Sequence, residues 1–392
     1  MAEFLQAVKH EMALCCHHRN RPPDTCNRPP STCNLLPDTC NRPPSTNSLP
    51  PETLYIGGGT PSLYRAEELG GLIEEVKRLW SCNLDEVTVE MNPEDVTFDY
   101  CQTLAQYGVN RLSFGIQSFF DAHLRFMNRR HNALQGIRAV EAARKAGSRN
   151  VSIDLIFGFP GLSMEQWRSN MEQAMALHPE HISAYQLSIE PGTSFYKMHQ
   201  QGLLQPIPQE EAAIQYALLQ ELLPSTGWEH YEISNFARPG FRSRHNSAYW
   251  QGVHYLGFGP SAHSYDGTNR YANVRHLERY LKCISETSEW FKTERLWPRK
   301  RYNEFIMTRL RTSEGFSEHA LATQLAPQCT PQCTPQCTPH CTSRFLAKVK
   351  RHFHEAAAPL LQNGLLSLHD GIYTIPREKW FISDGIIVSL MM

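Results

Sequence analysis

The sequence lacks any long apolar run and any marked excess of charge of one sign. No stretch of about 18 consecutive apolar residues occurs, so we expect no transmembrane helix. The formal net charge is -1 at pH 7, which gives no electrostatic reason to expect nucleic acid or an anionic membrane as a partner. The N-terminus has no apolar signal segment and does not resemble a transit peptide. We therefore expect a cytoplasmic protein, or a mitochondrial one if a targeting address precedes this chain.

The cysteines do not have the spacing of a secreted disulfide framework. Most of the 12 fall in two repetitive tracts, at 21–48 and 327–342, whose units each contain proline. Because proline disrupts helices and central strands, we predict a disordered heptad repeat at 21–50 and a low-complexity insertion at 327–342. The remaining, scattered cysteines indicate a reducing compartment. The run CCHH at 15–18 resembles a metal site, but adjacent side chains diverge, so we predict none there.

A glycine triplet at 57–59 follows the apolar, β-prone run 54–56 and precedes Thr60-Pro61-Ser62. Glycines let another molecule approach the backbone closely. Exposed amide groups at the end of a strand suit a carboxylate, an amine or a phosphate. No Lys-Ser/Thr follows the glycines, which excludes a Walker A loop. The alternative is a tight turn from strand to helix with no ligand.

Strand-like and helix-like segments alternate from residue 53 to about residue 190. The apolar β-branched runs are 54–56, 87–89, 112–116, 151–157 and 182–189, and the helical segments between them are 67–80, 98–107, 122–146 and 164–177. This alternation predicts βαβ units and a parallel sheet. The number of repeats, with no G-x-G-x-x-G at a turn from strand to helix, favours a full or partial (β/α) barrel over a Rossmann sheet.

Each predicted strand carries polar or small residues at or near its end. After the glycines of the first strand, these include Glu90, Gln117, Asp154 and Gln186 on the following four. One such residue is explained by a helix N-cap. The C-terminal ends of parallel strands form the active face of barrels, so five in succession predict a site for a polar ligand.

The later part of the chain predicts a cofactor rim and then a small helical domain. The segments YEISNFA (231–237), HNSAYW (245–250) and YLGFGPSAHS (255–264) are dense in aromatic, His, Asn and Gly residues, which fits a cofactor rim; the alternative is a packed sheet edge. After Arg270 we predict a charged, helical region with helices at 302–311 and 345–363. A hairpin at 365–375 with an Asp370-Gly371 turn completes a winged-helix-like tail.

Seven motifs together carry a resemblance to a known family. They are IGGGTPSL (56–63), EMNPE (90–94), GVNRLSFGIQSF (108–119), DLIFGFPG (154–161), YEISNFARPG (231–240), HNSAYW and GFGPSAHS. In this combination and order the chain resembles the radical S-adenosylmethionine proteins grouped with oxygen-independent coproporphyrinogen III oxidase, and within them the haem-chaperone branch, HemW.

The resemblance implies an α/β fold of defined parts. We expect a partial (β/α)6 barrel of the radical-SAM type that lacks its first strand and cluster loop, followed by a small C-terminal winged-helix-like α+β domain. Residues 1–20 would form a helix of the barrel, 51–285 the barrel with a haem-related extension, and 286–392 the C-terminal domain. The repeats at 21–50 and 327–342 interrupt this arrangement.

The resemblance also implies a set of ligands and site residues. The family binds S-adenosylmethionine, a 4Fe-4S cluster and, in the chaperone branch, haem. By motif match, the methionine end of S-adenosylmethionine would contact the glycine motif, other strand-end residues would line the same site, and HNSAYW would supply a haem contact. The residues of the glycine motif are Gly58, Gly59 and Thr60. The other residues that would line the site are Glu90, Gln117, Arg129 and Asp154, and the haem contact would be His245.

One departure from the family concerns the iron–sulfur cluster. The family holds its cluster with three cysteines spaced C-x3-C-x2-C, and this spacing occurs nowhere in the sequence. By motif match, residues 1–14 correspond to the helix that follows the cluster loop. Without thiolate ligands the cluster is not bound, and without its electron S-adenosylmethionine is not cleaved reductively.

These observations favour a haem chaperone that binds haem and S-adenosylmethionine and delivers haem to a recipient protein. The alternatives are an oxygen-independent coproporphyrinogen III oxidase, which forms protoporphyrinogen IX by oxidative decarboxylation, and a cluster-less scaffold or incomplete gene model. The family class is oxidoreductase, and the missing cysteines leave open whether this chain is an enzyme.

We predict that this chain, reconstituted anaerobically with iron and sulfide, assembles no stoichiometric 4Fe-4S cluster, because it supplies no C-x3-C-x2-C ligand set. Iron and acid-labile sulfide analysis after gel filtration checks the prediction. A radical-SAM protein that contains the motif serves as the positive control. A full cluster on this chain would contradict our account of the ligands.

Overall fold

We describe a computed structural model of the chain over residues 2–19, 50–325 and 339–392. The predicted repeat at 21–50 and the predicted insertion at 327–342 lie outside these residues, apart from Pro50 and the four residues 339–342, which form the start of a helix. The chain folds as two compact units. One comprises residues 1–54, 67–85 and 252–297, and the other residues 55–66, 86–251 and 298–392. No helix within the described ranges is long and apolar enough to cross a membrane.

The second unit is built on a seven-stranded sheet with the strand order β1-β2-β3-β4-β5-β7-β6. Strands β2 to β5 pair in parallel, whereas β7 is antiparallel to both β5 and β6. The predicted parallel sheet is therefore confirmed, and it closes on an antiparallel pair that the alternation pattern did not predict. The strands are β1 (Thr53–Ile56), β2 (Glu86–Met91), β3 (Arg111–Gln117), β4 (Val151–Phe157), β5 (His181–Gln186), β6 (Glu229–Glu232) and β7 (Asn235–Ala237).

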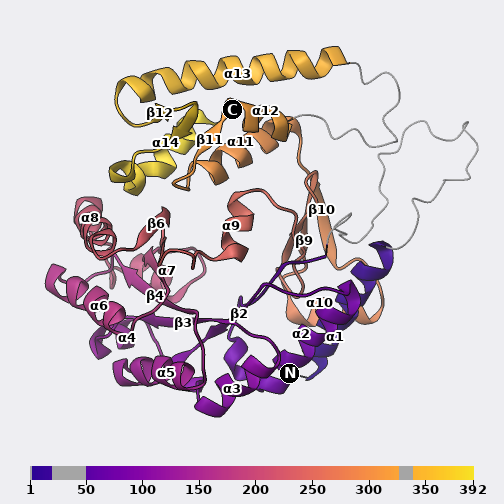
Figure 1. Ribbon diagram of the computed structural model, residues 1–392, viewed down its shortest axis with the longest axis vertical. Helices are drawn as coiled ribbons and strands as arrows, with labels where there is room; N and C mark the ends of the chain where they lie inside the picture. Colours follow the sequence, from indigo (N-terminus) through magenta and orange to yellow (C-terminus); the bar gives the residue numbers. More distant parts are fainter. Residues whose placement is uncertain (1, 20–49, 326–338) are drawn as a thin grey trace, which may run out of the picture. The chain divides into compact units, whose positions relative to one another are not determined.

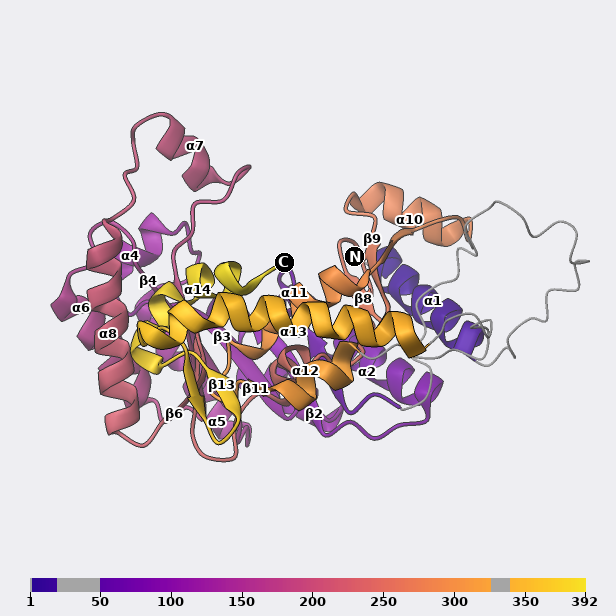
Figure 2. The same cartoon turned by 90° about the horizontal axis from the view of Figure 1, so that it is seen from above.

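Helices and short 3-10 turns connect these strands (Figure 1). They are η2 (Pro61–Leu63), η3 (Pro93–Asp95), α3 (Phe98–Gln106), α4 (Asp121–Phe126), α5 (Ala133–Lys145), α6 (Met164–Ala176), α7 (Ser194–Gln200), α8 (Gln209–Ser225) and α9 (Arg244–Trp250). Capping boxes start α5 at Asn132 and α6 at Ser163, because the side chain and backbone of each cap satisfy otherwise unpaired amides. Figure 2 shows α7 on a projection that extends away from the sheet.

Two predicted helices have different limits in the structure. The single helix predicted at 122–146 is wrong: α4 ends before Asn128, whose φ of 53° is left-handed, and Asn132 caps a new helix, α5. The loop between them carries Arg129. The sequence also predicts a helix at 204–223, but α8 begins only at Gln209, since Pro206 and Pro208 precede it and proline disfavours helix for the residue before it.

The sheet has one apolar and one polar face. Residues that alternate along a strand point to opposite faces. Helices α5, α6 and α8 contact the sheet. One set of side chains is apolar and buried, and it consists of Val87, Val89, Leu112, Phe114, Val151, Ile153, Leu155, Ile182 and Ala184. The other set is polar: Glu86, Thr88, Glu90, Arg111, Ser113, Ser152, Asp154, His181 and Ser183. This polar face carries the candidate site.

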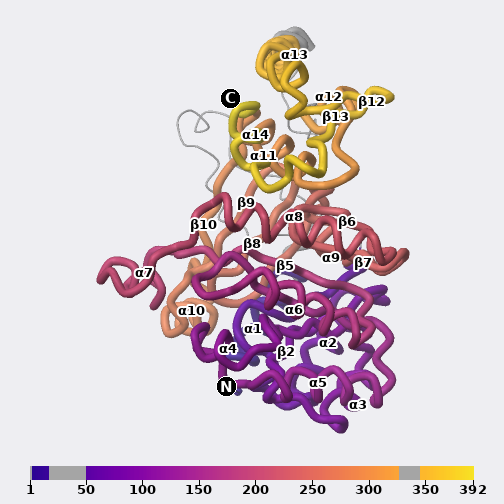
Figure 3. Tube along the Cα trace, turned by 90° about the vertical axis from the view of Figure 1, so that its left-hand side faces the viewer, coloured from indigo at the N-terminus to yellow at the C-terminus, as the bar shows by residue number. Residues whose placement is uncertain are grey.

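The C-terminal part of this unit is helical with a small sheet of order β11-β13-β12. Asp370 and Gly371 have φ of 50° and 77°, as a two-residue type I′ turn requires, so the predicted hairpin is confirmed. Helix α14 contacts both α11 and α13, as Figure 3 shows. The elements are α11 (Pro298–Arg309), β11 (Phe316–Ser317), α12 (Glu318–Leu325), α13 (Pro339–Gln362), β12 (Ser367–His369), β13 (Ile372–Thr374), η4 (Arg377–Ile382) and α14 (Ser383–Leu390).

The first unit combines helices with a three-stranded sheet of order β10-β9-β8. Its elements are α1 (Ala2–Arg19), nearly all of α2 (Ala66–Trp80), β8 (His263–Tyr265), β9 (Asn269–Asn273), α10 (Leu277–Ser285) and β10 (Phe291–Arg295). Strand β10 corrects the prediction of a purely helical region after Arg270. It pairs antiparallel with β9 from Phe291 to Arg295, a long-range pairing that the charged sequence does not reveal.

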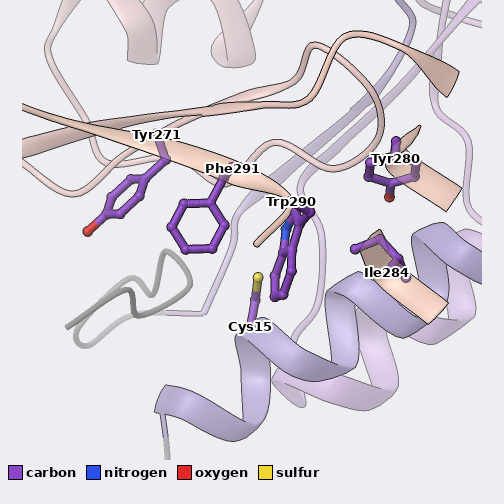
Figure 4. Packing of buried hydrophobic residues seen from close by; sticks show 6 residues of the cluster. All are labelled: Cys15, Tyr271, Tyr280, Ile284, Trp290 and Phe291. Carbon is purple, nitrogen blue, oxygen red and sulfur yellow. The ribbon is translucent and has the colours of Figure 1, made fainter. Parts of the chain in front are cut away.

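Helix α1 extends through Cys15 and Cys16 to Arg19. The Cys16 thiol donates to the carbonyl of Leu79 at 3.1 Å. Figure 4 shows Cys15 rising from α1 toward Trp290, in an apolar cluster that also contains Tyr280 of α10. Among the residues that the structure describes, no group of three His, Cys, Asp or Glu side chains is placed to hold a metal.

A buried carboxylate joins α1 to the rest of this unit. Glu11 is 1% exposed. Its Oε2 accepts from Gly259 N at 2.9 Å and Tyr280 OH at 2.5 Å, and its Oε1 accepts from Asn273 Nδ2 at 2.7 Å and Trp290 Nε1 at 3.1 Å. Burial raises the pKa of Glu11, and these four donors oppose that shift. The group is therefore fully satisfied, as a buried polar side chain must be.

We predict that Glu11→Ala lowers the free energy of unfolding by about 2–4 kcal/mol, because it leaves four buried donors without their acceptor. Urea unfolding followed by circular dichroism measures the change. Glu3→Ala, on the exposed surface of the same helix, is the control and should change stability by about 0.5 kcal/mol at most. Equal stability of Glu11→Ala and the control would contradict the structural role of Glu11.

Candidate functional site

The glycine segment after β1 is shaped by its neighbours. A Cβ atom on Gly57 would lie 2.5 Å from Glu90 Cδ and 2.6 Å from Tyr55 Cε1, so only glycine fits. Gly58 has a φ of 81°, which glycine adopts without strain. Gly58 and Gly59 are exposed, and the Thr60 carbonyl accepts from Leu63 N to begin η2. Backbone amides are thus presented at the end of β1.

Glu90, at the end of β2, holds the segment in place. Its Oε2 accepts from Gly58 N at 3.1 Å, and its Oε1 accepts from the Tyr55 hydroxyl at 2.8 Å. Burial raises the pKa of Tyr55, and the negative charges of Glu90 and Asp154 raise it further. The phenol therefore stays protonated and acts as the donor in this pair.

Asp154 lies on the same polar face, two strands away. It pairs with Ser183 in the sheet register, and it hydrogen-bonds the side chains of Ser183 and Ser113. Burial raises its pKa to about 6, and the nearby charge of Glu90 contributes to the increase. Two carboxyl groups on one rim disfavour each other's ionised form, so the rim is prepared for a ligand with positive charge or hydroxyl donors.

Gln117 and Arg129 meet beside Gly115. A Cβ on Gly115 would lie 2.9 Å from Gln117 Nε2 and 3.2 Å from Arg129 Nη2. Arg129 Nη2 donates to Asn92 Oδ1 at 2.8 Å and to the Gly115 carbonyl at 3.1 Å. Gln117 ends β3 with a left-handed φ of 66°. Burial lowers the pKa of Arg129, and the carboxylates of Glu94 and, more weakly, Asp154 oppose that shift.

His245, in the HNSAYW motif, is positioned by Glu86 of β2 and by Tyr55 of β1. The carboxylate of Glu86, at the start of β2, accepts from the amides of Arg244 at 3.0 Å and His245 at 2.9 Å. Its ring stacks on Tyr55 with centroids 5.1 Å apart and planes at 25°. His245 Nε2 and the Tyr249 hydroxyl are 3.1 Å apart. Burial lowers the pKa of His245, so its imidazole is neutral near pH 7.

The structure thus brings most of the predicted residues together. Gly58, Glu90 and His245 are linked through Tyr55, the charges of Glu90 and Asp154 interact, and Gln117 and Arg129 both lie against Gly115. Gly59 and Thr60 follow Gly58 on the same exposed segment. Chain continuity alone places these two residues beside the rest of the site.

Three further residues of this region were not predicted. Tyr55 and Tyr185 lie within electrostatic range of Glu90 and Asp154. Glu232, 1% exposed at the end of β6, accepts from Ser234 N at 3.1 Å and from the Asn235 side chain. Burial raises the pKa of Glu232 to about 7. Alternation along β1 places Tyr55 on the same face as Gly57, and this was the one signal available in the sequence.

A cavity of about 510 Å³ opens at the ends of β4 and β5. Gly158, Gln186 and Ser188 line it from the sheet, and Tyr196 and His199 of α7 line the opposite side. Gln186 closely approaches Gly158, where a Cβ would lie 2.6 Å from the Gln186 Cγ atom. The cavity holds no charged side chain in its lining and is large enough for a drug-sized ligand.

The polar groups of the site fit S-adenosylmethionine but do not fit a 4Fe-4S cluster. Exposed amides beside two carboxyl groups suit a zwitterionic amino acid with an attached ribose, which is the chemistry of S-adenosylmethionine. A 4Fe-4S cluster does not fit: the C-x3-C-x2-C spacing is absent from the sequence, and no ligand cluster occurs in the described part of the chain. We therefore derive no step through a cluster.

Comparisons with known proteins identify relatives of this chain. The family model described as "Radical SAM superfamily" matches residues 47–174. "Heme chaperone HemW" of Bacillus subtilis is 37% identical over 273 residues, which cover 69% of this chain and 72% of that protein. "Radical S-adenosyl methionine domain-containing protein 1, mitochondrial" of Danio rerio is 36% identical over 233 residues, or 58% of this chain and 52% of that protein.

The fold also matches a solved structure. The coproporphyrinogen III oxidase HemN of Escherichia coli, described as a radical SAM enzyme, superimposes with a TM-score of 0.74 and 18% sequence identity, covering 100% of this chain and 83% of that chain. At this identity the match shows the fold alone. It confirms the predicted partial radical-SAM-type barrel.

We predict that Asp154→Asn changes how the stability of the protein depends on pH. The native pKa of about 6 lies above the unfolded value of about 3.9, so the native state binds more protons between them, and wild-type stability falls as pH rises through this window. Asn does not titrate. The stability of Asp154→Asn relative to wild type should therefore rise by about 1–2 kcal/mol from pH 5 to pH 8.

Urea unfolding at pH 5 and pH 8 measures this difference. Asp99→Asn replaces an exposed carboxyl in the first turn of α3 and is the control, with no comparable pH dependence expected. A constant difference between Asp154→Asn and wild type across this range would show that Asp154 titrates normally.

Proposed function

The chain belongs to the HemW family of radical SAM proteins, and on that premise we propose that it is a haem chaperone that binds haem and passes it to a recipient protein. The observation that carries the proposal is the arrangement of His245. Glu86 fixes its backbone, Tyr55 stacks on its ring, and its Nε2 lies 3.1 Å from the Tyr249 hydroxyl. A neutral, oriented imidazole is a suitable ligand for haem iron.

The same rim is proposed to hold S-adenosylmethionine. Gly58, Gly59 and Thr60 would receive the carboxylate of its methionine end through exposed amides. Glu90 and Asp154 would accept from its ammonium and ribose hydroxyls, with Gln117 and Arg129 completing the wall. The closeness of Gly58 to Glu90 and the electrostatic coupling of Glu90 to Asp154 support this assignment.

The family is classed among the oxidoreductases, but the residues of this chain favour transport of haem over redox chemistry. Reductive cleavage of S-adenosylmethionine needs an electron from a cluster, and this chain lacks the ligand set for one. Bound S-adenosylmethionine would then act as a ligand that organises the rim. No contact in the structure favours decarboxylation of coproporphyrinogen.

The proposed partners are haem or another porphyrin and a haem-recipient protein. The proposed compartment is the cytoplasm. The alternative is the mitochondrion, because the Danio rerio relative carries that designation in its name. The described residues contain no candidate membrane span.

We predict that the wild-type chain binds ferric haem with a shift of the Soret band, and that His245→Ala weakens binding by about 10-fold or more, since it removes the iron ligand itself. Titration of ferric haem followed by absorbance measures the dissociation constants. His369→Ala removes a surface histidine whose side chain is 86% exposed and should bind as wild type does. Failure of the wild type to shift the Soret band would refute the proposed function.

A further inference from the structure

A continuous set of contacts links the glycine segment to His245. Gly58 N donates to one oxygen of Glu90, the Tyr55 hydroxyl donates to the other, and the Tyr55 ring stacks on His245. Tyr55 therefore contacts both the carboxylate of the rim and the imidazole of the HNSAYW motif. All these residues belong to the same compact unit.

Strand β2 is the rigid frame for both ends of this set. Glu86 and Glu90 lie four residues apart on the polar face, so their side chains point the same way. Glu86 accepts from the His245 amide, and Glu90 accepts from Tyr55 and Gly58. The backbone of His245 is thus anchored independently of Tyr55. A change at Tyr55 can alter the surroundings of the imidazole ring without releasing helix α9.

We propose that Tyr55 is a positioning residue that couples occupancy of the glycine segment by S-adenosylmethionine to the availability of His245 for haem iron. The inference rests on the proposed function, because it requires both ligands to bind. In the ligand-free protein Tyr55 covers one face of the imidazole. When S-adenosylmethionine binds, its ammonium competes for Glu90, Tyr55 loses its acceptor, and the ring leaves the face of His245.

The direction of the effect follows from hydrogen-bond strength. The Glu90 carboxylate assists both bonds with its charge, but the ammonium adds a full positive charge that attracts the carboxylate more strongly than the phenol dipole does, so the ligand displaces the phenol. The phenol does not compensate by ionising, since burial and the carboxylates around it raise its pKa. Without its acceptor the hydroxyl must seek another partner or water, and the stacked position is no longer favoured.

The removal of Tyr55 matters because of the geometry of haem. An imidazole bound to haem iron stands upright on the macrocycle, so the macrocycle needs room on both faces of the ring around Nε2. A tyrosine stacked 5.1 Å from the imidazole takes up room on one face. Tyr249, whose hydroxyl lies 3.1 Å from Nε2, must yield to iron in either state. The coupling therefore acts through Tyr55.

Thermodynamic linkage between haem and S-adenosylmethionine gives the proposed coupling a measurable size. If S-adenosylmethionine raises the affinity for haem by a factor, haem must raise the affinity for S-adenosylmethionine by the same factor. A coupling of about 5-fold or more is expected, at the lower end of the range for linked sites. The two effects are measured separately and need no variant.

The test uses the full chain, ferric haem and S-adenosylmethionine. Equilibrium dialysis and Soret titration first measure each ligand alone, and haem titration is then repeated with saturating S-adenosylmethionine. In the wild type the haem dissociation constant should fall by about 5-fold or more. In Tyr55→Phe it should be the same with and without S-adenosylmethionine, because the ring is no longer tied to Glu90. Tyr302→Phe removes a buried hydroxyl that donates to Leu390 and should retain the coupling.

The outcomes separate this inference from the proposed function. If the wild type binds both ligands but its haem affinity is unchanged by S-adenosylmethionine, or if Tyr55→Phe keeps the full coupling, the inference is wrong and the chaperone function stands. If the wild type does not bind one of the two ligands, the proposed function fails and the inference fails with it. Should Tyr55→Phe misfold, the reciprocal measurement on the wild type decides: haem that leaves S-adenosylmethionine affinity unchanged refutes the coupling.

Discussion

The site depends on the alternation of side chains along parallel strands. Each strand places successive residues on opposite faces, so a single strand such as β2 contributes Val87 and Val89 to the apolar face and Glu86 and Glu90 to the polar one. Helices cover the apolar face, and that burial supplies the main stabilising free energy of the unit. The polar face can then be devoted to binding, because the fold does not depend on it for hydrophobic packing.

Burial of carboxyl groups on the polar face lowers the stability of the protein, and this cost indicates that they have a functional role. Asp154 and Glu232 have pKa values raised to about 6 and about 7, chiefly by burial, so keeping them ionised at neutral pH works against stability. Glu11, in the other unit, is also buried, but four donors surround its carboxylate. Perturbed carboxyls on an open rim are typical of ligand sites, whereas a fully paired internal one is typical of structure.

The comparisons with known proteins explain the sheet of this chain, but the sequence lacks the ligands for the iron–sulfur cluster of the family. The matched relatives and the HemN-like fold account for the sheet and its rim. The iron–sulfur cluster needs thiolates that the sequence does not supply in the family spacing. Cys15, Cys16, Cys82 and Cys101 are buried and form no disulfide bond, and burial raises the pKa of Cys15 and of Cys101, which makes both poor metal ligands.

The sequence by itself determined the local elements and the chemistry of the rim. Apolar β-branched runs predicted β1 to β5, Asp370-Gly371 predicted a hairpin, and the polar residues at strand ends predicted that Glu90 and Asp154 share one edge, because these signals depend on neighbours in the chain. It did not reveal the break between α4 and α5 at Asn128, the pairing of β10 with β9, or the stacking of Tyr55 on His245. Those features depend on long-range contacts and on a left-handed backbone that local propensity does not encode. Only the tertiary structure places a tyrosine from the first strand against a histidine far along the chain, since the curvature of the sheet, and not any spacing of residues, brings them together.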